Sequence, residues 1–520
     1  MKKWKWIHRW FSLVLGLLLI LWAISGIILN HRSLFSNFEL NRNLLPPEYR
    51  YQNWNNASVR SGLQLNSDSL LIYGNIGIWL TDTTFSQYKP FMEGMPKGVD
   101  NIKTSRLIIT PHGHLFAGTQ TGIYFFQREI QEWIKIALDI HDERITDLTI
   151  KNGKLVVLSR SEIFLAGYDT AVPEFIKVLL PAASDDDNQI GLFRTLWVIH
   201  SGEIFGLPGK IIIDFFALLL IFFVITGYIY FFFPRWIKKR KKKKLEYNNL
   251  IKSSRFSIKW HNKLGIWLGG FLILTTLTGM FLRPPLLIAI GNVRVGKIPF
   301  SVLNSHNTWH DRLRTIHWNE EGEYWLIGTN DGIYFTDASL KNAPAPFLNQ
   351  PPVSVMGINV FEPTGKGSYF VGSFNGLFLW QPTLGLVQDY ITGEVPNKKN
   401  SAGSPLGTHL ISGMIRLENK LLLFEYNHGL LKEKIPMPPA IQSTPMPLWN
   451  VALEIHTARI FQNLIGIFYI LIIPIFGIST LLILISGIII WLKKNGGYSP
   501  DRLFHLRHYI IVNLFRKKER

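Results

Sequence analysis

Four apolar runs, each long enough to cross a bilayer, constrain this chain more than any other feature of its sequence. They cover residues 11–29, 211–233, 264–290 and 461–492. About 20 apolar residues suffice to span the hydrocarbon core as a helix. We therefore expect a multi-pass membrane protein with four transmembrane helices. Pro474 lies inside the last run, where it predicts a kink.

The apolar runs divide the chain into eight predicted segments. The predicted membrane spans are residues 1–30, 208–234, 263–290 and 456–492. Two long polar insertions, residues 31–207 and 291–455, follow the first and third spans. Residues 235–262 form a basic loop, and residues 493–520 form a basic tail.

Lysine and arginine are distributed in a way that orients the spans. The formal net charge is +19, and the densest basic run, residues 238–244, lies between the second and third spans. Because cytoplasmic loops carry the excess of Lys and Arg, we expect both termini and the basic loop in the cytoplasm. The insertions then face the periplasm of a bacterial inner membrane. Orientation in membrane lipid explains the basic excess, so we expect no nucleic-acid partner.

The sequence excludes several classes of cofactor. It contains no cysteine, which rules out disulfides, cysteine-ligated zinc, iron–sulfur clusters and covalent haem attachment. It also contains no phosphate-binding P-loop and no Gly-x-Gly-x-x-Gly after a predicted strand. We expect no NAD(P)H or nucleotide domain.

An internal duplication relates the two halves of the chain. One shared offset aligns His8 with His261, Ser25 with Thr278, Gly26 with Gly279 and Leu29 with Leu282. A second matching pair, Ile-His-x-x-x-Ile-Phe, surrounds His200 and His456 just before the second and fourth spans. Duplication explains such shared spacing better than chance does. The repeated unit is a span, an outer insertion, a histidine motif and a second span.

Both insertions contain a short repeat that is typical of β-structure. Similar Gly-rich segments occur at residues 74–79, 118–124, 328–334 and 372–378, with weaker copies at 159–164 and 425–430. Each copy predicts a strand, a tight turn and a strand. Most spacings are near the period of a propeller blade. We expect an all-β, propeller-like region of about six blades contributed by both insertions; the alternative is two small β-sandwich-like domains.

The histidines fall into two groups by predicted depth. His8 and His261 begin the first and third spans on the cytoplasmic side, whereas His31, His200 and His456 lie at outer ends of spans. Imidazoles from two facing helices are the geometry that holds a b-type haem. We therefore predict about two haem b groups, with iron bound through these histidines. The alternative is that the histidines only anchor helix ends at the membrane interface.

The chain resembles the PepSY-associated transmembrane family. The matching motifs are His8-Arg9-Trp10 with Ser25-Gly26, His200 with Thr226-Gly227, His261 with Thr278-Gly279, and His456 with Ser486-Gly487. That family includes inner-membrane proteins that reduce ferric siderophores in the periplasm through haem groups. The resemblance implies that His8 and His261 are the inner haem ligands and that His200 and His456 are the outer ones. His31 competes for an outer position.

The sequence departs from the family pattern in two places. The insertions resemble propeller blades rather than a compact PepSY domain, so the family's substrate site and any catalytic residues are not carried over. The third span ends in Arg283-Pro284-Pro285, where the first span has Asn30-His31. The two halves therefore differ at the outer face.

These observations predict a haem-binding electron-transfer protein that reduces a periplasmic ferric chelate or siderophore for iron acquisition. Since no nucleotide motif is present, we expect electrons to come from quinol or from another protein. The alternative is a non-enzymatic sensor or binding protein, in which a periplasmic β-propeller is anchored by the helices.

Overall fold

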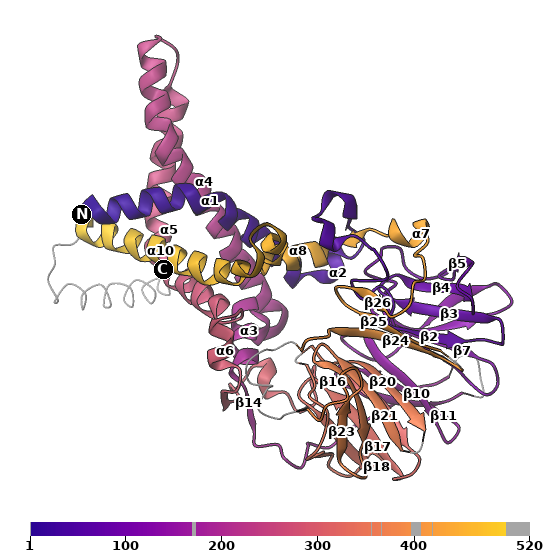
Figure 1. The fold of residues 1–520 in the computed structure, drawn as a ribbon. Coiled ribbons are helices and arrows are strands. Elements are labelled where there is room, and N and C mark those ends of the chain that lie inside the picture. Colours follow the sequence, from indigo (N-terminus) through magenta and orange to yellow (C-terminus); the bar gives the residue numbers. More distant parts are fainter. Residues whose placement is uncertain are drawn as a thin grey trace. The chain divides into compact units, whose positions relative to one another are not determined.

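The computed structural model describes residues 2–168, 173–354, 356–365, 367–396, 407–418 and 420–495 (Figure 1). Most of the predicted basic tail, residues 496–520, lies outside this described part. The chain forms two compact units. The membrane unit comprises Met1–His31, Gln189–Asn304 and Ala452–Arg520, and the β unit comprises Arg32–Asn188 and Ser305–Val451.

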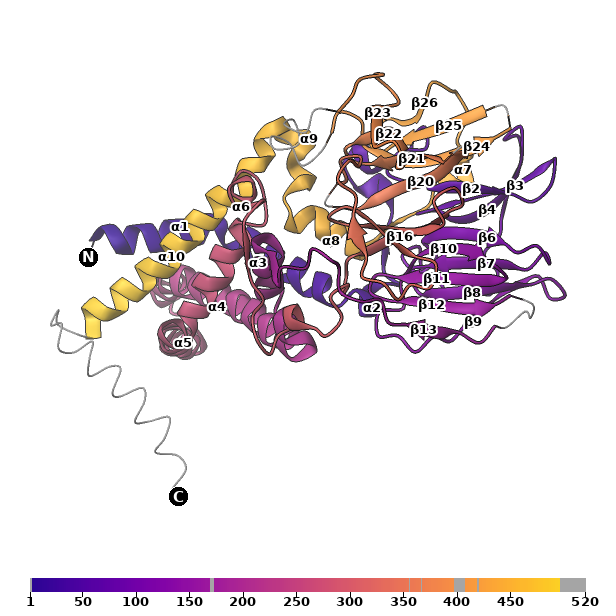
Figure 2. The same cartoon turned by 90° about the horizontal axis from the view of Figure 1, so that it is seen from below.

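Within the described residues, the membrane unit contains four helices that are long and apolar enough to cross a bilayer. They are α1 (Lys2–Asn30), α4 (Gly206–Lys242), α5 (Asn248–Met280) and α10 (Ile472–Asn495). Helix α1 packs against α4 and α10, and α5 packs against the same two helices (Figure 2). The chain is therefore a multi-pass membrane protein with a four-helix arrangement.

The third and fourth spans are each interrupted near one end, the third at the prolines that the sequence analysis notes. Helix α5 stops at Met280, and the prolines that follow separate it from the short helix α6 (Leu286–Ile290). The fourth span is interrupted before α10 by α9 (Gln462–Ile465) and a 3₁₀ segment, η7 (Gly466–Leu471). Pro474 lies in the first turn of α10, where proline is tolerated. The predicted kink at Pro474 is therefore wrong, because the break comes earlier.

Short helices precede the second and fourth spans in the same way. Helix α3 (Leu192–Ser201) ends at left-handed Gly202 and leads through η3 (Glu203–Phe205) into α4. Helix α8 (Leu448–His456) is followed by left-handed Ala458 and η6 (Arg459–Phe461). The matching histidine motifs thus fold into matching helix–turn units, as a duplication requires.

In its described residues, the β unit contains six antiparallel sheets of three or four strands, numbered I to VI here in chain order. The first insertion contributes sheets I (β2 Ser61–Gln64, β3 Ser69–Gly74, β4 Gly77–Asp82, β5 Tyr88–Pro90), II (β6 Thr104–Ile109, β7 Leu115–Thr119, β8 Gly122–Gln127, β9 Glu132–Ile136) and III (β10 Ile145–Lys151, β11 Lys154–Ser159, β12 Ile163–Gly167, β13 Ile176–Val178). The second contributes sheets IV (β16 Leu313–Asn319, β17 Tyr324–Thr329, β18 Ile333–Asp337, β19 Ala345–Pro346), V (β20 Ile358–Gly365, β21 Ser368–Ser373, β22 Gly376–Gln381, β23 Leu386–Asp389) and VI (β24 Ile411–Leu417, β25 Lys420–Glu425, β26 Gly429–Leu431). Each repeat seen in the sequence joins the second and third strands of a sheet.

Buried apolar clusters connect each sheet of the β unit to the next. Sheets I and II, II and III, III and IV, IV and V, and V and VI each share one cluster. A further cluster joins sheet VI back to sheet I through residues such as Leu422 and Ile72. Strand β1 (Glu39–Leu40) also pairs with β27 (Met446–Pro447) across the two insertions. Both insertions therefore build one compact unit, and the alternative of two separate domains is wrong.

Candidate functional site

Two histidines of the inner pair, His8 on α1 and His261 on α5, lie ring against ring. Their ring centres are 6.1 Å apart and their planes are nearly perpendicular, at 89°. The Nδ1 of His8 lies 2.9 Å from the carbonyl oxygen of Ile483 and 3.2 Å from the hydroxyl of Ser486, both on α10. Since a carbonyl can only accept, this Nδ1 carries the proton.

The Nδ1 of His261 is also hydrogen-bonded to a neighbouring helix, in this case α4. Its Nδ1 lies 2.8 Å from the hydroxyl oxygen of Thr226 on α4. The hydroxyl of Thr226 donates its own hydrogen to the carbonyl of Phe222 at 2.7 Å. Thr226 therefore accepts from His261, whose Nδ1 is protonated as well.

The outer pair consists of His200, at the end of α3, and His456, at the end of α8. Their ring centres are 6.0 Å apart, with an interplanar angle of 51°. The Nδ1 of His200 donates to the carbonyl of Thr275 on α5 at 2.9 Å. The Nδ1 of His456 lies 3.0 Å from the hydroxyl of Ser25 and 3.2 Å from the carbonyl of Trp22, both on α1.

Each imidazole rests on a hydroxyl residue followed by glycine. A Cβ added to that glycine meets the Cε1 of the histidine at 2.6 Å for Gly279 and His200, 3.1 Å for Gly487 and His8, 3.3 Å for Gly26 and His456, and 4.0 Å for Gly227 and His261. The hydroxyls all donate to a carbonyl of their own helix, which leaves the oxygen free to accept from Nδ1. Each of the four Ser/Thr-Gly pairs noted in the sequence therefore contacts one histidine ring, and we call this contact the hydroxyl cradle of that histidine.

The geometry of both pairs fits a haem iron. With Nδ1 committed as a donor, the lone pair of each ring is on Nε2, the usual metal-binding nitrogen. An imidazole nitrogen binds a transition metal at about 2.0 Å, so two rings on opposite sides of one iron have centres roughly 6 Å apart. Among the described residues, no group of three or more His, Cys, Asp or Glu is arranged to hold a metal ion. Each pair could supply two imidazole ligands to one haem iron.

The two pairs lie in separate layers of the membrane unit. Helix α1 contributes His8 to the inner pair and Ser25 to the surroundings of His456 in the outer pair. Helix α5 likewise contributes His261 to the inner pair and Thr278 to the surroundings of His200 in the outer pair. At 1.5 Å of rise per residue the layers are roughly 25 Å apart along these helices. Such a separation matches most of the thickness of a bilayer core.

His31 is engaged elsewhere. Its Nε2 hydrogen-bonds to the carboxylate of Asp214 on α4, and Asn30 donates to the same carboxylate at 3.1 Å. The structure therefore brings His200 and His456 together and leaves His31 beside a carboxylate. Asp214 is an acidic residue within the second apolar run, and an ionisable residue in such a run is by default a sign of function.

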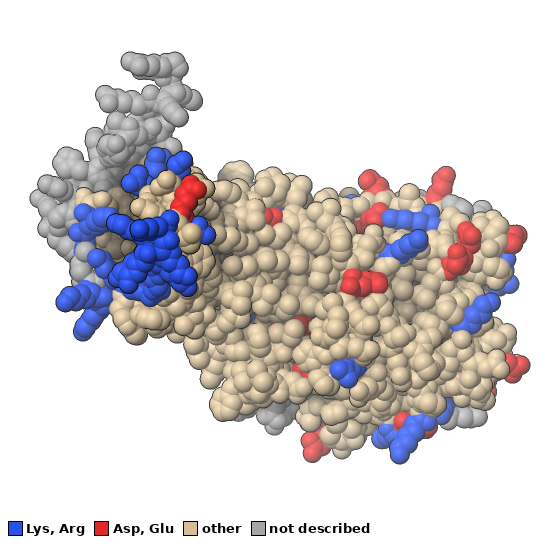
Figure 3. All heavy atoms as spheres, turned by 90° about the horizontal axis from the view of Figure 1, so that it is seen from above, with Lys and Arg blue, Asp and Glu red and all other residues tan. Residues whose placement is uncertain are grey.

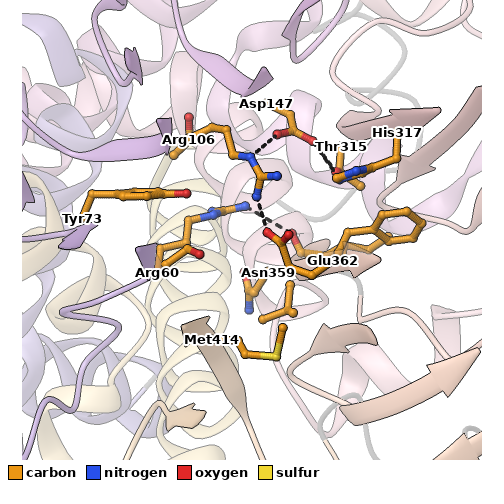
Figure 4. A pocket seen from close by; sticks show the side chains of 14 residues that line it. Arg60, Tyr73, Arg106, Asp147, Thr315, His317, Asn359, Glu362 and Met414 are labelled. Carbon is orange, nitrogen blue, oxygen red and sulfur yellow. Dashed lines mark hydrogen bonds and ion pairs between the residues drawn. The ribbon is translucent and has the colours of Figure 1, made fainter. Parts of the chain in front are cut away.

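The β unit contains a polar cavity lined mainly by the first strand of each sheet (Figure 4). The lining residues include Arg60, Arg106, Asp147, His317, Glu362 and Met414. The space open to the centre of a water molecule is about 20 Å³. That volume holds a water molecule but no ferric chelate.

Charged groups in this cavity join the two insertions. Arg106 donates to Glu362, and its Nε lies 3.6 Å from Asp147. Asp147 also accepts from the hydroxyl of Thr315 and, at 3.0 Å, from a backbone N–H. Burial lowers the pKa of Arg106, but the charges of Glu362, Tyr73 and Asp147 together outweigh burial and raise it. Burial lowers the pKa of His317, against the attraction of Asp147.

Surface charge differs between the units. Figure 3 shows lysines and arginines crowded at one end of the membrane unit and mixed with acidic residues over the β unit. The last turn of α4 contains Lys239, Arg240, Lys241 and Lys242. This basic end fits the side of the membrane predicted to be cytoplasmic.

Comparison with known proteins gives one informative match. The family model described as "PepSY-associated TM region" matches residues 233–494, about half of the chain. This match confirms the resemblance inferred from the histidine motifs. No curated protein matches the sequence.

Solved structures resemble the chain only remotely. The extracellular domain of the putative one component system BT4673 from B. thetaiotaomicron is 11% identical, with a TM-score of 0.33. The match covers 73% of this chain and 39% of that one, so the chain spans about two fifths of that protein's length. The computationally designed Ika8 protein is 10% identical, with a TM-score of 0.32 and coverage of 75% and 90%. Likeness this weak supports no argument about function.

Proposed function

The chain belongs to the family of the PepSY-associated TM region, and on that premise we propose that it is a haem-binding electron-transfer protein of the bacterial inner membrane. One observation carries the proposal: two imidazole pairs, each with ring centres near 6 Å and each with Nε2 left free. Bound between two imidazoles, haem iron takes up and gives up single electrons without losing a protein ligand.

The protein's own residues fix the rings before any cofactor binds. Ser and Thr hydroxyls and helix carbonyls hold each Nδ1–H, which selects the tautomer and aims Nε2. Glycines let the rings lie close to the neighbouring helix. Apolar helices fill the space between the layers and exclude water from it.

We propose that the β unit is a closed six-bladed propeller in the periplasm. The circuit of shared cores, from sheet VI back to sheet I, supports closure, because a closed ring leaves few exposed sheet edges. The basic end of the membrane unit supports an orientation with both termini in the cytoplasm.

The proposed substrate is a ferric chelate, such as a siderophore complex, reduced near the outer pair. One electron converts the ferric complex to the ferrous complex, which holds its iron weakly. Quinol oxidation to quinone, with release of two protons and two electrons, or another protein supplies the reductant. The polar cavity of the β unit is too small for a chelate, so this substrate binds elsewhere.

Visible spectroscopy of the purified, full-length protein tests the proposal. We expect a Soret band that sharpens on reduction and about two haem groups per chain. His8→Ala or His261→Ala removes one haem, and His200→Ala or His456→Ala removes the other. His31→Ala is the matched control and leaves both. A chain that purifies without haem, with all these histidines present, rejects the proposal.

A further inference from the structure

Four arginines of the β unit lie where sheets III and IV meet, and we call them the arginine cluster: Arg144, Arg160, Arg312 and Arg314. Arg144 directly precedes β10 and Arg160 directly follows β11, and the register pairs these two strand ends. The backbone N–H of Leu313, the first residue of β16, donates to the carbonyl of Arg160 at 2.9 Å. Arg312 and Arg314 flank Leu313, so all four arginines belong to the same end of the two sheets.

Two of these arginines are held only loosely by carboxylates. Arg144 contacts Asp142 through one Nη2 at 3.3 Å, and Arg312 contacts Asp331 through one Nη2 at 3.0 Å. Both aspartate side chains are 46% exposed. Exposed ion pairs of this kind contribute about 1 kcal/mol or less. A ligand carboxylate can therefore replace either aspartate at little cost.

Other donors of the cluster lack a strong acceptor within the protein. Arg314 donates from Nη1 to the carbonyl of Leu313 at 2.8 Å, and within the part of the chain that the structure describes no carboxylate forms an ion pair with it. The Nε atoms of Arg144 and Arg312 are buried without a hydrogen-bond acceptor among the described residues. Donors left in this state cost free energy. The hydrogen-bonding capacity of the cluster is thus incompletely used.

The guanidinium groups also repel one another. Burial, and after it the charge of Arg160, lowers the pKa of Arg314 to about 9. The same two causes lower the pKa of Arg144 to about 10. Arg160 itself pairs with Asp311 at 2.5 Å, and the attraction of Asp311 offsets only part of both effects. The cluster therefore attracts an added anion.

We propose that the arginine cluster binds a small chelate that carries several carboxylates, such as a ferric hydroxycarboxylate complex. This inference rests on the proposed function and names its substrate class. A guanidinium binds a carboxylate through two parallel hydrogen bonds, and four such groups spread over two sheets match several carboxylates. The side chains of Arg144, Arg160 and Arg312 are 28%, 23% and 24% exposed, so a ligand reaches them from solvent.

Isothermal titration calorimetry of the purified full-length protein with gallium(III) citrate tests this inference. Gallium(III) has the charge of ferric iron but is not reduced, so binding is measured apart from electron transfer. We expect binding to the wild-type protein that weakens as salt is added. Arg144→Gln and Arg314→Gln should each weaken it by about tenfold, the loss typical of one charged hydrogen bond. Arg314→Lys keeps the charge and should bind with an intermediate affinity.

A matched variant and two further probes provide the controls. Arg416→Gln removes an exposed arginine near the last residue of β24, the first strand of sheet VI, and should bind like the wild type. A cationic gallium trihydroxamate should not bind. Three outcomes overturn the inference: no binding of gallium citrate at about 1 mM, equal affinity in the wild type and both glutamine variants, or equally tight binding of inorganic phosphate. Where a glutamine variant unfolds, the salt dependence and the phosphate comparison of the wild type decide.

The haem content of the same preparation separates this inference from the proposed function. Protein that contains haem but does not bind gallium citrate overturns this inference alone. Protein without haem rejects the electron-transfer proposal, whereas arginine-dependent binding of gallium citrate still supports the binding site.

Discussion

At the scale of single residues, the protonation of each imidazole decides what the site can bind. Every histidine of the two pairs has its Nδ1 against a helix carbonyl or against a hydroxyl whose hydrogen is already donated. The protein fold alone therefore determines that Nε2 is the unprotonated nitrogen of each ring. A neighbouring glycine sets how closely each ring approaches the next helix.

Gly279→Ala tests the closest of these contacts. Its new Cβ meets the Cε1 of His200 at 2.6 Å, so the ring must move. We expect loss of the outer haem and retention of the inner one, measured as haem content per chain. Gly270→Ala on the same helix is the control, because Gly270 is exposed and a Cβ there meets nothing within 4 Å. It should keep both haems and gain up to about 1 kcal/mol of helix stability.

Thr226→Val tests the role of the hydroxyl cradle. Valine keeps the shape of threonine but leaves the Nδ1–H of His261 without its acceptor. Loss of such an orienting partner typically weakens binding at the ligand by about 10–100-fold, and we expect the affinity for the inner haem to fall by this factor. The rate of haem transfer to an acceptor protein measures the loss. Thr480→Val on α10, whose hydroxyl bonds the Phe476 carbonyl, is the matched control. Equal haem loss in both variants would contradict a specific role for Thr226.

At the scale of secondary-structure elements, the two halves use one helix–turn unit with different residues. The turn after α3 is left-handed at Gly202, with φ of 78°, and the turn after α8 is left-handed at Ala458, with φ of 60°. Alanine in this conformation is strained. Ala458 is also fully buried, so its methyl group compensates part of that strain.

The reciprocal substitutions should therefore be unequal. Gly202→Ala places a Cβ 2.2 Å from the carbonyl oxygen of Gly209 in a left-handed turn, and we expect a loss of about 2 kcal/mol or more. Ala458→Gly relieves about 1 kcal/mol of strain and loses about 0.8 kcal/mol of methyl burial, so it should be nearly neutral. Thermal unfolding in detergent measures both. A strongly destabilised Ala458→Gly protein would show that burial outweighs strain.

Local patterns predicted the elements better than they predicted the contacts between them. The membrane spans and β-hairpins follow from apolar runs and Gly-rich turns, which are short-range signals. The break before α10 was missed because Gly466 and its neighbours are as apolar as the helix itself. The pairing of His200 with His456 and the partner of His31 depend on contacts between distant segments. Family motifs pointed to the Ser/Thr-Gly pairs, but their contact with histidine required the structure.

At the scale of the whole molecule, the β unit depends on both insertions. Arg106 of the first insertion bonds to Glu362 of the second, and their side chains are 22% and 24% exposed. The same cavity brings Asp147 against Thr315. The two halves of the duplicated chain are thus joined by charge as well as by apolar packing.

Glu362→Gln tests this connection, because it leaves Arg106 with less compensation in a mostly buried cavity. We expect the free energy of unfolding of the β unit to fall by about 3 kcal/mol, measured by chemical denaturation followed through tryptophan fluorescence. The double variant Arg106→Met/Glu362→Met removes both charges but also takes the guanidinium away from the buried Asp147, so we expect it to be destabilised by less than the sum of the two single variants. A single variant as stable as the wild type would mean that the pair does not help to hold the insertions together.

The shared core of sheets I and VI also sets an order on biosynthesis. Sheets I to III emerge from the ribosome first, but the partner that covers the outer face of sheet I, sheet VI, is among the last parts of the β unit to be made. Sheet III stays uncovered until sheet IV is made, and sheet I stays uncovered until sheet VI is made; apolar surfaces and strand edges exposed in this way favour aggregation. We therefore expect the first half of the chain to be more prone to aggregation when it is made alone than when the second half follows it.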